Sequence, residues 1–366
     1  PRTNEQLWAE IYRTEWTASG MYEVRTEVAE QVARQLDVNL APDESVRLSS
    51  LPTANTDAYV AYQRGRYFWN DRTEAGLLEA VEHFKRATEL DSNFALAYSG
   101  LADAYTLLPH YGRRSLDGVA AAPLARAAAL KAVALVSMSA EAHTSLAAVH
   151  HFFDWDLDAA IVEFRKALTL NDSYATAHHW YGQLLYYVGR LSEAVAECER
   201  AAELDPLSRI IASDLGHHLR MSGRLEEATQ RYRQTLALDS TFLPARNGLA
   251  TTYRELGRYE EALAEYRKAN NARGQREVEV LLGVRADTLA LQEQLADAET
   301  TWRMAQTYAT VGNADSALIW LAVAFEERSV SVARTFWEPE WDLVREDPRF
   351  IELTNRVKYT GSADRR

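Results

Sequence analysis

Seven of the nine histidines of this 366-residue chain fall in one stretch, between residues 143 and 218. Imidazole groups serve as zinc ligands and as general acids or bases near neutral pH, so such a cluster could carry either chemistry. No two of them are spaced as His-x3-His on one helix, and we find no acidic ligand following in phase. We therefore interpret them first as packing or hydrogen-bonding residues, second as ligand contacts and third as a metal site. They are His143, His150, His151, His178, His179, His217 and His218.

The sequence motifs of common enzymes are absent. There is no GxxxxGK[ST] phosphate loop, no GxGxxG, no HExxH and no GxSxG. The paired carboxylates Glu226-Glu227 and Glu260-Glu261 begin expected helices, where the helix dipole favours acidic residues. The single cysteine, Cys198, cannot form an internal disulfide or a multi-cysteine zinc site, and we interpret it as a buried packing residue. These observations predict a protein that is not an enzyme and binds no cofactor.

Composition and net charge limit which classes of partner the protein is expected to bind. The chain has 40 basic and 53 acidic residues, a net charge of −13, which disfavours nucleic acid as a partner. A hydrophobic content of 47% and a charged content of 25% are typical of ordered globular proteins. No stretch approaches the roughly 18–20 uncharged apolar residues that a membrane span needs, so we expect no membrane insertion.

The elements that must position the histidines repeat every 34 residues. Three segments, 188–206, 222–240 and 256–269, align without a gap. Each contains a Gly-Arg turn and then a second helix that opens on Leu/Tyr-x-Glu-Ala. Four sets of positions keep the same step: Gly189, Gly223 and Gly257; Ala194, Ala228 and Ala262; Cys198, Tyr232 and Tyr266; and Gly182, Gly216 and Ala250.

Local chemistry explains this period. A turn glycine suits the left-handed backbone that ends a first helix, and Asp205-Pro206 ends a second helix because proline lacks an N–H donor. Small residues at the alanine positions let two helices approach closely. Weaker copies of the pattern make seven units over residues 56–327, with interruptions near 110–120 and 270–296.

These residues resemble the tetratricopeptide repeat family. The resemblance implies an all-α superhelical solenoid of about seven helix pairs, with a short N-terminal strand and helix remnant and a C-terminal helical cap. It divides the chain into residues 1–55, 56–327 and 328–366. It also implies a non-catalytic protein–protein interaction scaffold that binds a protein or peptide partner.

The ends of the chain resemble parts of bacterial multidomain regulators in which a TolB-like or FlgO-like domain precedes tetratricopeptide repeats. The matching residues lie in a strand expected at 7–16, a helix at 21–38, the segment 52–59 and the tail motif 347–350. Such parents carry a kinase, a cyclase or a winged-helix domain. Because the chain starts at Pro1 rather than Met, we expect a segment of a longer protein. We expect it in the cytoplasm, or alternatively on the periplasmic side of a membrane-anchored parent.

In this family the first helices line a concave groove where ligands bind. The lysine–asparagine clamp of chaperone-binding members is missing, because its slots hold His179 and Gln183, Ser213 and His217, and Asn247 and Thr251. Aromatic and amide groups with two arginines suit the binding of an extended peptide. The alternative is that this face is polar only because it is exposed to solvent. The predicted groove residues are His151, His179, Gln183, Tyr186, Tyr187, His217, Arg220, Asn247, Thr251 and Arg254.

Three functions remain open at this point. The first is an interaction or sensory module that regulates a fused effector. The second is a homo-oligomerisation platform, with a possible homodimer. The strand expected at 7–16 and the tryptophan-rich tail favour this function. The third, a small-molecule or metal sensor, rests on the histidines alone.

Overall fold

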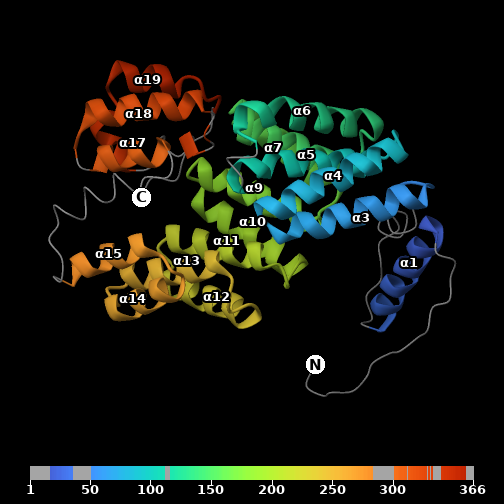
Figure 1. Cartoon of the computed structure of the whole chain (residues 1–366), viewed down its shortest axis with the longest axis horizontal. Coiled ribbons are helices and arrows are strands. Elements are labelled where there is room, and N and C mark those ends of the chain that lie inside the picture. The colour runs from blue at the N-terminus through green and yellow to red at the C-terminus, as the bar shows by residue number, and fades with distance from the viewer. Residues whose placement is uncertain are drawn as a thin grey trace. The chain divides into compact units, whose positions relative to one another are not determined.

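The computed structural model describes residues 17–35, 51–111, 116–282, 301–310, 312–327, 329, 331–332 and 339–359, which are mostly helical (Figure 1). Within these ranges the extended backbone forms no strand and only one isolated bridge, between Asp156 and Lys358. The strand expected at 7–16 lies outside the described residues. The chain divides into two compact units, residues 1–117 with 123–137, and residues 118–122 with 138–366.

The first unit contains the first two helix pairs, preceded by a separate helix. Phe84 is fully buried, and its ring lies so close to Gly65 and Gly100 that a Cβ added at either glycine would come within 2.6 Å of it. Tyr22 meets the ring of Tyr59 edge to face, with centroids 5.8 Å apart. The helices are α1 (Ala18–Gln35), α3 (Thr56–Asp71), α4 (Glu74–Leu90), α5 (Ala95–Tyr111) and most of α6 (Gly118–Leu135).

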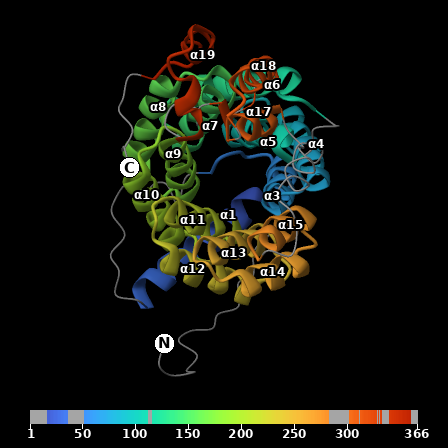
Figure 2. The ribbon, with the colours of Figure 1, turned by 90° about the vertical axis from the view of Figure 1, so that its left-hand side faces the viewer.

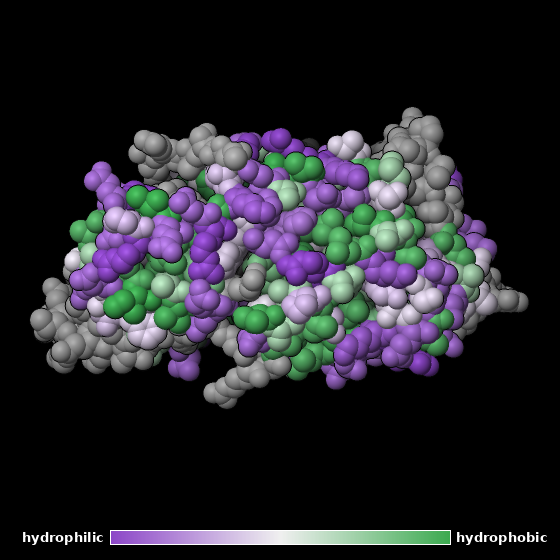
Figure 3. Space-filling view, turned by 90° about the horizontal axis from the view of Figure 1, so that it is seen from above, coloured by the Kyte–Doolittle hydropathy of each residue, from purple (hydrophilic) through white to green (hydrophobic). Residues whose placement is uncertain are grey.

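Among the residues that the structure describes, α6 has the length and apolar composition of a membrane span. The sequence analysis looked for an uncharged run, and in α6 such a run is interrupted by Arg126 and Lys131. Ala125, Ala129 and Ala132 on α6 are fully buried, as in the core helix of a folded domain. Seen from above, hydrophobic areas of the surface are broken up by hydrophilic ones (Figure 3).

The second unit contains five further helix pairs and the C-terminal cap, so the described residues hold the seven helix pairs that the repeat predicted. Its first half comprises α7 (Ala140–Val149), a π-helical turn η1 (His150–Asp154), α8 (Leu157–Leu170), α9 (Ala175–Tyr187), α10 (Leu191–Leu204), α11 (Arg209–Met221) and α12 (Leu225–Leu238). Its second half comprises α13 (Leu243–Glu255), α14 (Tyr259–Lys268), α15 (Ala272–Leu281), α17 (Thr301–Thr310), α18 (Ala314–Glu326), η3 (Pro339–Val344) and α19 (Pro348–Thr354).

Turn glycines separate the two helices of the later pairs. Gly189, Gly223 and Gly257 have φ angles of 76°, 78° and 72°, in the left-handed region that only glycine adopts without strain. Arg190, Arg224 and Arg258 follow them and precede the second helices. The Gly-Arg signature in the sequence therefore marks the helix-to-helix turns, and the step of 34 residues is one helix pair.

We expect Gly223→Ala to lower the free energy of unfolding by about 1–2 kcal/mol, the cost of a left-handed backbone for an L-residue. A Cβ at this position meets nothing within 4 Å, so the loss comes from backbone strain rather than a clash. Chemical unfolding at neutral pH measures it. Glu226→Ala is the neighbouring control, because Glu226 is exposed in the first turn of α12. An unchanged stability of Gly223→Ala would contradict the strained-turn explanation.

The π-helical turn makes the third pair different from the others. It adds one residue to the end of the first helix and is followed by Trp155 with a φ of 51°. As a result, His143 and its partner on the second helix are 20 residues apart, whereas the equivalent pair of the next repeat, which starts at His178, is 19 apart. A π-turn thus accounts for the extra residue in this repeat.

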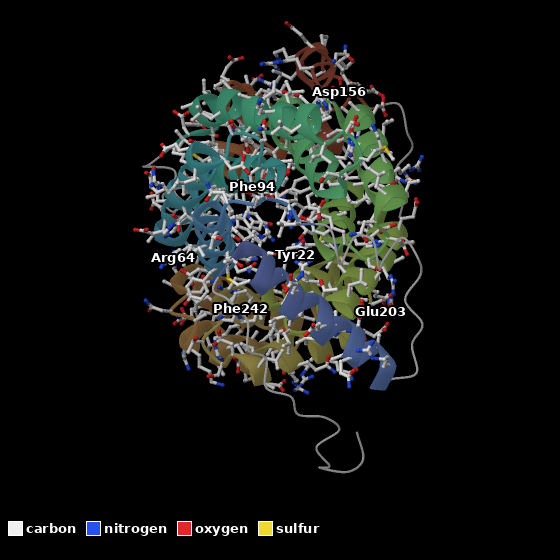
Figure 4. All side chains as sticks on the ribbon, turned by 90° about the vertical axis from the view of Figure 1, so that its right-hand side faces the viewer. Tyr22, Arg64, Phe94, Asp156, Glu203 and Phe242 are labelled. Carbon is white, nitrogen blue, oxygen red and sulfur yellow. The ribbon has the colours of Figure 1, made fainter. Side chains whose placement is uncertain are left out.

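The residues that follow α19 return to this turn. The backbone N–H of Lys358 donates to the carbonyl of Trp155, and the N–H of Leu157 donates to the carbonyl of Lys358, both at 2.9 Å. Lys358 Nζ also contacts Asp156 Oδ2 at 2.7 Å, and Asp156 lies near the C-terminal helix in Figure 4. We call residues 356–359 the C-terminal strap.

Aromatic packing accompanies the C-terminal strap. The Trp155 ring meets the ring of Phe325, on α18, edge to face at 5.2 Å. The Arg356 guanidinium lies over both rings, 5.8 and 5.2 Å from their centroids. The last helix pair is therefore attached to the third pair by backbone, ionic and aromatic contacts together.

Candidate binding face on the first helices

The first helices of successive pairs in the second unit lie next to one another. Contacts join α7 to α9, α9 to α11 and α11 to α13, and α13 also contacts the following helix α15. Figure 2 shows α7, α9, α11 and α13 on the inner side of their partner helices α8, α10, α12 and α14. We call the side of α9, α11 and α13 that carries seven half-buried residues the inner face; they are Gln183, Tyr187, His217, Arg220, Asn247, Thr251 and Arg254.

Three further residues predicted to line the groove lie deeper. His151, His179 and Tyr186 are only 0%, 3% and 4% exposed, so they support the inner face from below instead of forming its surface. The sequence analysis predicted that all three would contact a ligand, from their positions on single helices. In the structure the neighbouring first helices are close enough to cover them, an effect that spacing within a single helix does not reveal.

An acidic residue that the sequence analysis missed lies at the centre of this region. Asp214 on α11 receives hydrogen bonds from His179 Nε2 and Gln183 Nε2, each 2.7 Å from Asp214 Oδ2. Burial alone would raise the pKa of Asp214, but the His179 hydrogen bond and nearby imidazoles lower it to about 2. Asp214 comes 35 residues after His179, one repeat and one residue later, and that spacing was the signal available in the sequence.

Aromatic rings in contact with one another extend from the π-helical turn η1 across α9 to α11. The His151 ring meets Tyr187 edge to face at 5.1 Å, and Tyr187 meets Tyr186 at 5.5 Å. Tyr186 then contacts His217 at 4.9 Å and stacks on His218 at 5.1 Å. Such contacts hold the rings in place, so Tyr187 and His217 present preordered flat surfaces on the inner face.

His218 and Cys198 form a buried polar pair behind these rings. The His218 Nδ1 and Cys198 Sγ atoms are 3.2 Å apart. Burial lowers the pKa of His218 to about 4, so its imidazole is neutral at pH 7. Burial also raises the pKa of the Cys198 thiol well above its usual range, which rules out a reactive thiolate at neutral pH. Cys198 is therefore a packing residue, as expected.

Two other histidines each connect the first and second helix of their own pair. His143 Nδ1 lies 2.5 Å from Glu163 Oε2, and His178 Nδ1 lies 2.6 Å from Glu197 Oε2. For His178 burial acts to lower the pKa, but the Glu197 hydrogen bond and the backbone carbonyl of Asp172 raise it overall. These pairs support the hydrogen-bonding interpretation of the histidines. No group of three potential metal ligands occurs in the part of the chain that the structure describes.

The other end of the inner face is already internally paired. Arg220 forms an ion pair with Glu255 on α13, and its Nη2 lies 3.2 Å from His217 Nδ1. Asn247 Oδ1 accepts from Asn271 Nδ2 at 2.8 Å. A ligand carboxylate that approached Arg220 would have to compete with Glu255.

Comparison with known proteins identifies the repeats. Family models described as tetratricopeptide repeat match residues 175–206 and 219–282. These two segments are tetratricopeptide repeats. The two matches cover α9 and α10, and then the region from the end of α11 into the residue after α15. Tetratricopeptide repeat proteins generally mediate protein–protein interactions, and their fold is typically non-catalytic.

Several solved structures, two of them described as tetratricopeptide repeat proteins, are similar to this chain. YrrB, described as having an unusual peptide-binding site, is 21% identical, covers 56% of this chain and 100% of its own, and has a TM-score of 0.39. TTC0263 of Thermus thermophilus is 19% identical, with coverages of 53% and 98% and a TM-score of 0.44. PilF of Pseudomonas aeruginosa is 19% identical, with coverages of 69% and 96% and a TM-score of 0.37. No curated protein matches the chain.

Proposed function

We propose that this protein is a non-catalytic interaction module that binds an extended peptide segment of a partner protein along the inner face. The observation that carries the proposal is the continuity of the inner face over α9, α11 and α13. On α9 and α11, aromatic rings lie beside amide and imidazole groups. Amides can satisfy the backbone of an extended peptide, while tyrosine supplies flat contact area at low entropic cost.

The wider biological role is part of the same proposal. A regulatory or sensory module that is fused to an effector fits an array without catalytic motifs, and the TolB-like or FlgO-like context stays a prediction. A net charge of −13 makes a protein partner more favourable than nucleic acid. A cytoplasmic location is part of the proposal, and the periplasmic side of a membrane-anchored parent is its alternative. A homodimer stays a prediction as well.

A library of random 12-residue peptides displayed on phage tests the proposal. We expect the full chain to enrich peptides that share a motif and to bind their synthetic forms in solution. The double variant Tyr187→Ala/Asn247→Ala should bind them at least roughly tenfold more weakly, because it loses a flat contact and an amide on the inner face. Fluorescence anisotropy measures the affinity.

Leu207→Ala is the matched control, because Leu207 is 77% exposed in the turn between α10 and α11, away from the inner face. It should bind like the wild type. Enrichment of no peptide, or equal binding by the double variant, would refute peptide recognition on the inner face.

A further inference from the structure

The two carboxylate oxygens of Asp214 are used unequally. His179 and Gln183 both donate their hydrogen bonds to Oδ2. Asp214 Oδ1 makes no hydrogen bond to any residue that the structure describes, and 31% of the Asp214 side chain is accessible. A half-buried carboxylate thus keeps one oxygen available to an incoming donor, while its other oxygen holds the side chain in place.

Gln183 adds a second acceptor beside this carboxylate. A carboxylate only accepts hydrogen bonds, so the Gln183 amide must turn its Nε2 toward Asp214. That orientation leaves Gln183 Oε1 as the remaining polar atom of the side chain. Oε1 accepts no hydrogen bond from the described residues. Two side chains that are hydrogen-bonded to each other, Gln183 on α9 and Asp214 on α11, therefore each keep one acceptor without a matching donor.

The nearby Arg220 guanidinium does not cancel the negative charge of Asp214. Arg220 is ion-paired with Glu255, so the two charges offset each other. Because a guanidinium only donates, His217 Nδ1 accepts from Arg220 and the imidazole is neutral in this arrangement. Aromatic faces border the same place, since Tyr186 contacts both Tyr187 and His217. An anionic oxygen, an amide oxygen and aromatic rings together suit a group that carries only donors and a positive charge.

Resting on the proposed function, we propose that Asp214 and Gln183 Oε1 bind the positively charged side chain of a lysine or arginine in the partner peptide, next to the Tyr187 and His217 rings. The net charge of the whole chain, −13, also favours a positively charged partner. The inner face of this array is therefore specific for basic peptides. A peptide amino terminus has related chemistry, and the experiment below separates the two.

The test uses peptides enriched from the random phage library by the full chain. We expect lysine or arginine at one fixed position of the shared motif. Replacing that residue in the synthetic peptide with norleucine removes the charge but keeps an unbranched apolar stem. This change should weaken binding to the wild-type protein by roughly 10- to 100-fold. Acetylating the peptide amino terminus should leave the affinity unchanged.

Asp214→Asn should reduce the affinity for the basic peptide by a similar factor, and it should abolish the difference between the basic and norleucine peptides. Glu203→Gln is the matched control, because it removes one negative charge from α10, where the Glu203 side chain is 68% exposed and lies at the outer edge of Figure 4. It should preserve the preference. Circular dichroism checks that each variant is folded. The norleucine comparison on the wild type decides the question even where Asp214→Asn is unfolded.

Each remaining outcome overturns the inference. Enriched peptides without a conserved basic residue, or an unchanged norleucine affinity, would show that the inner face binds peptides by another chemistry, and the proposed function would stand. Loss of binding on acetylation would assign the site to the amino terminus instead. Enrichment of no peptide at all would remove the proposed function and this inference together.

Discussion

Tyr232→Ala should lower the free energy of unfolding by about 3–5 kcal/mol, the range of large aromatic truncations in protein cores. Tyr232 on α12 is only 1% exposed. Its ring packs against the backbone of two successive first helices: a Cβ added at Gly216 or Gly248 would come within 2.8 or 2.3 Å of it. Removing the ring leaves a cavity that α11 and α13 cannot close without shifting, because both helices also pack on other neighbours.

Two variants separate cavity formation from the loss of polar contacts. Tyr232→Phe keeps the ring and loses only the hydroxyl, so it should cost about 1 kcal/mol. Gly248→Ala should destabilise by about 1–3 kcal/mol, because the new methyl group overpacks the same contact. Urea unfolding at pH 7 measures all three. A Tyr232→Ala variant no less stable than Tyr232→Phe would show that this contact is unimportant.

Acidification should destabilise the protein through His218. The pKa of His218 in the folded protein is about 4, below its ordinary value of 6.5, because burial disfavours the charged imidazole. As the pH falls below 6.5, the unfolded chain takes up this proton first. Stability is therefore lost progressively and the loss is complete below about pH 4. It amounts to about 3 kcal/mol from this residue.

The variant His218→Gln, which does not titrate, isolates this effect. The difference in unfolding free energy between wild type and variant should change by about 3 kcal/mol from pH 7 to pH 4. The contribution of Asp214 lies in a separate window, because its folded pKa of about 2 confines its loss to pH values below about 4. His178, with a raised pKa, loses its stabilisation only as the pH rises. A difference independent of pH would contradict a neutral, buried His218.

The repeat pattern made the helix pairs predictable because each position in it has a local cause. The turn glycines adopt positive φ angles, and the alanines that recur every 34 residues, such as Ala194 and Ala228, are fully buried between helices. Tyr232 and Cys198 occupy the same position in successive repeats. Each packs against a glycine of the first helix of its own pair, Gly216 for Tyr232 and Gly182 for Cys198. These are short-range or nearest-neighbour requirements, which a periodic sequence reports directly.

The candidate site was less predictable because its chemistry arises between helices. Asp214 matters only because α11 brings it against His179 and Gln183 on α9, and the sequence analysis searched for acids within single helices. The position of a residue along one helix predicts which side of the helix it lies on, but not how deeply it is buried. It therefore did not reveal that His151 and Tyr186 are buried. Burial depends on how closely neighbouring helices approach, which single-helix phase does not contain.

The C-terminal strap changes how the array should fold and unfold. In an open repeat array each pair contacts only its neighbours, so the terminal pair unravels independently. Here Lys358 is bonded to residues 202 positions earlier in the chain, next to an interior pair. Closing a flexible loop of that length costs about 5 kcal/mol in chain entropy, so the attachment should form late, after the intervening repeats have folded. Once formed, it couples the loss of the last pair to the third and makes unfolding more cooperative.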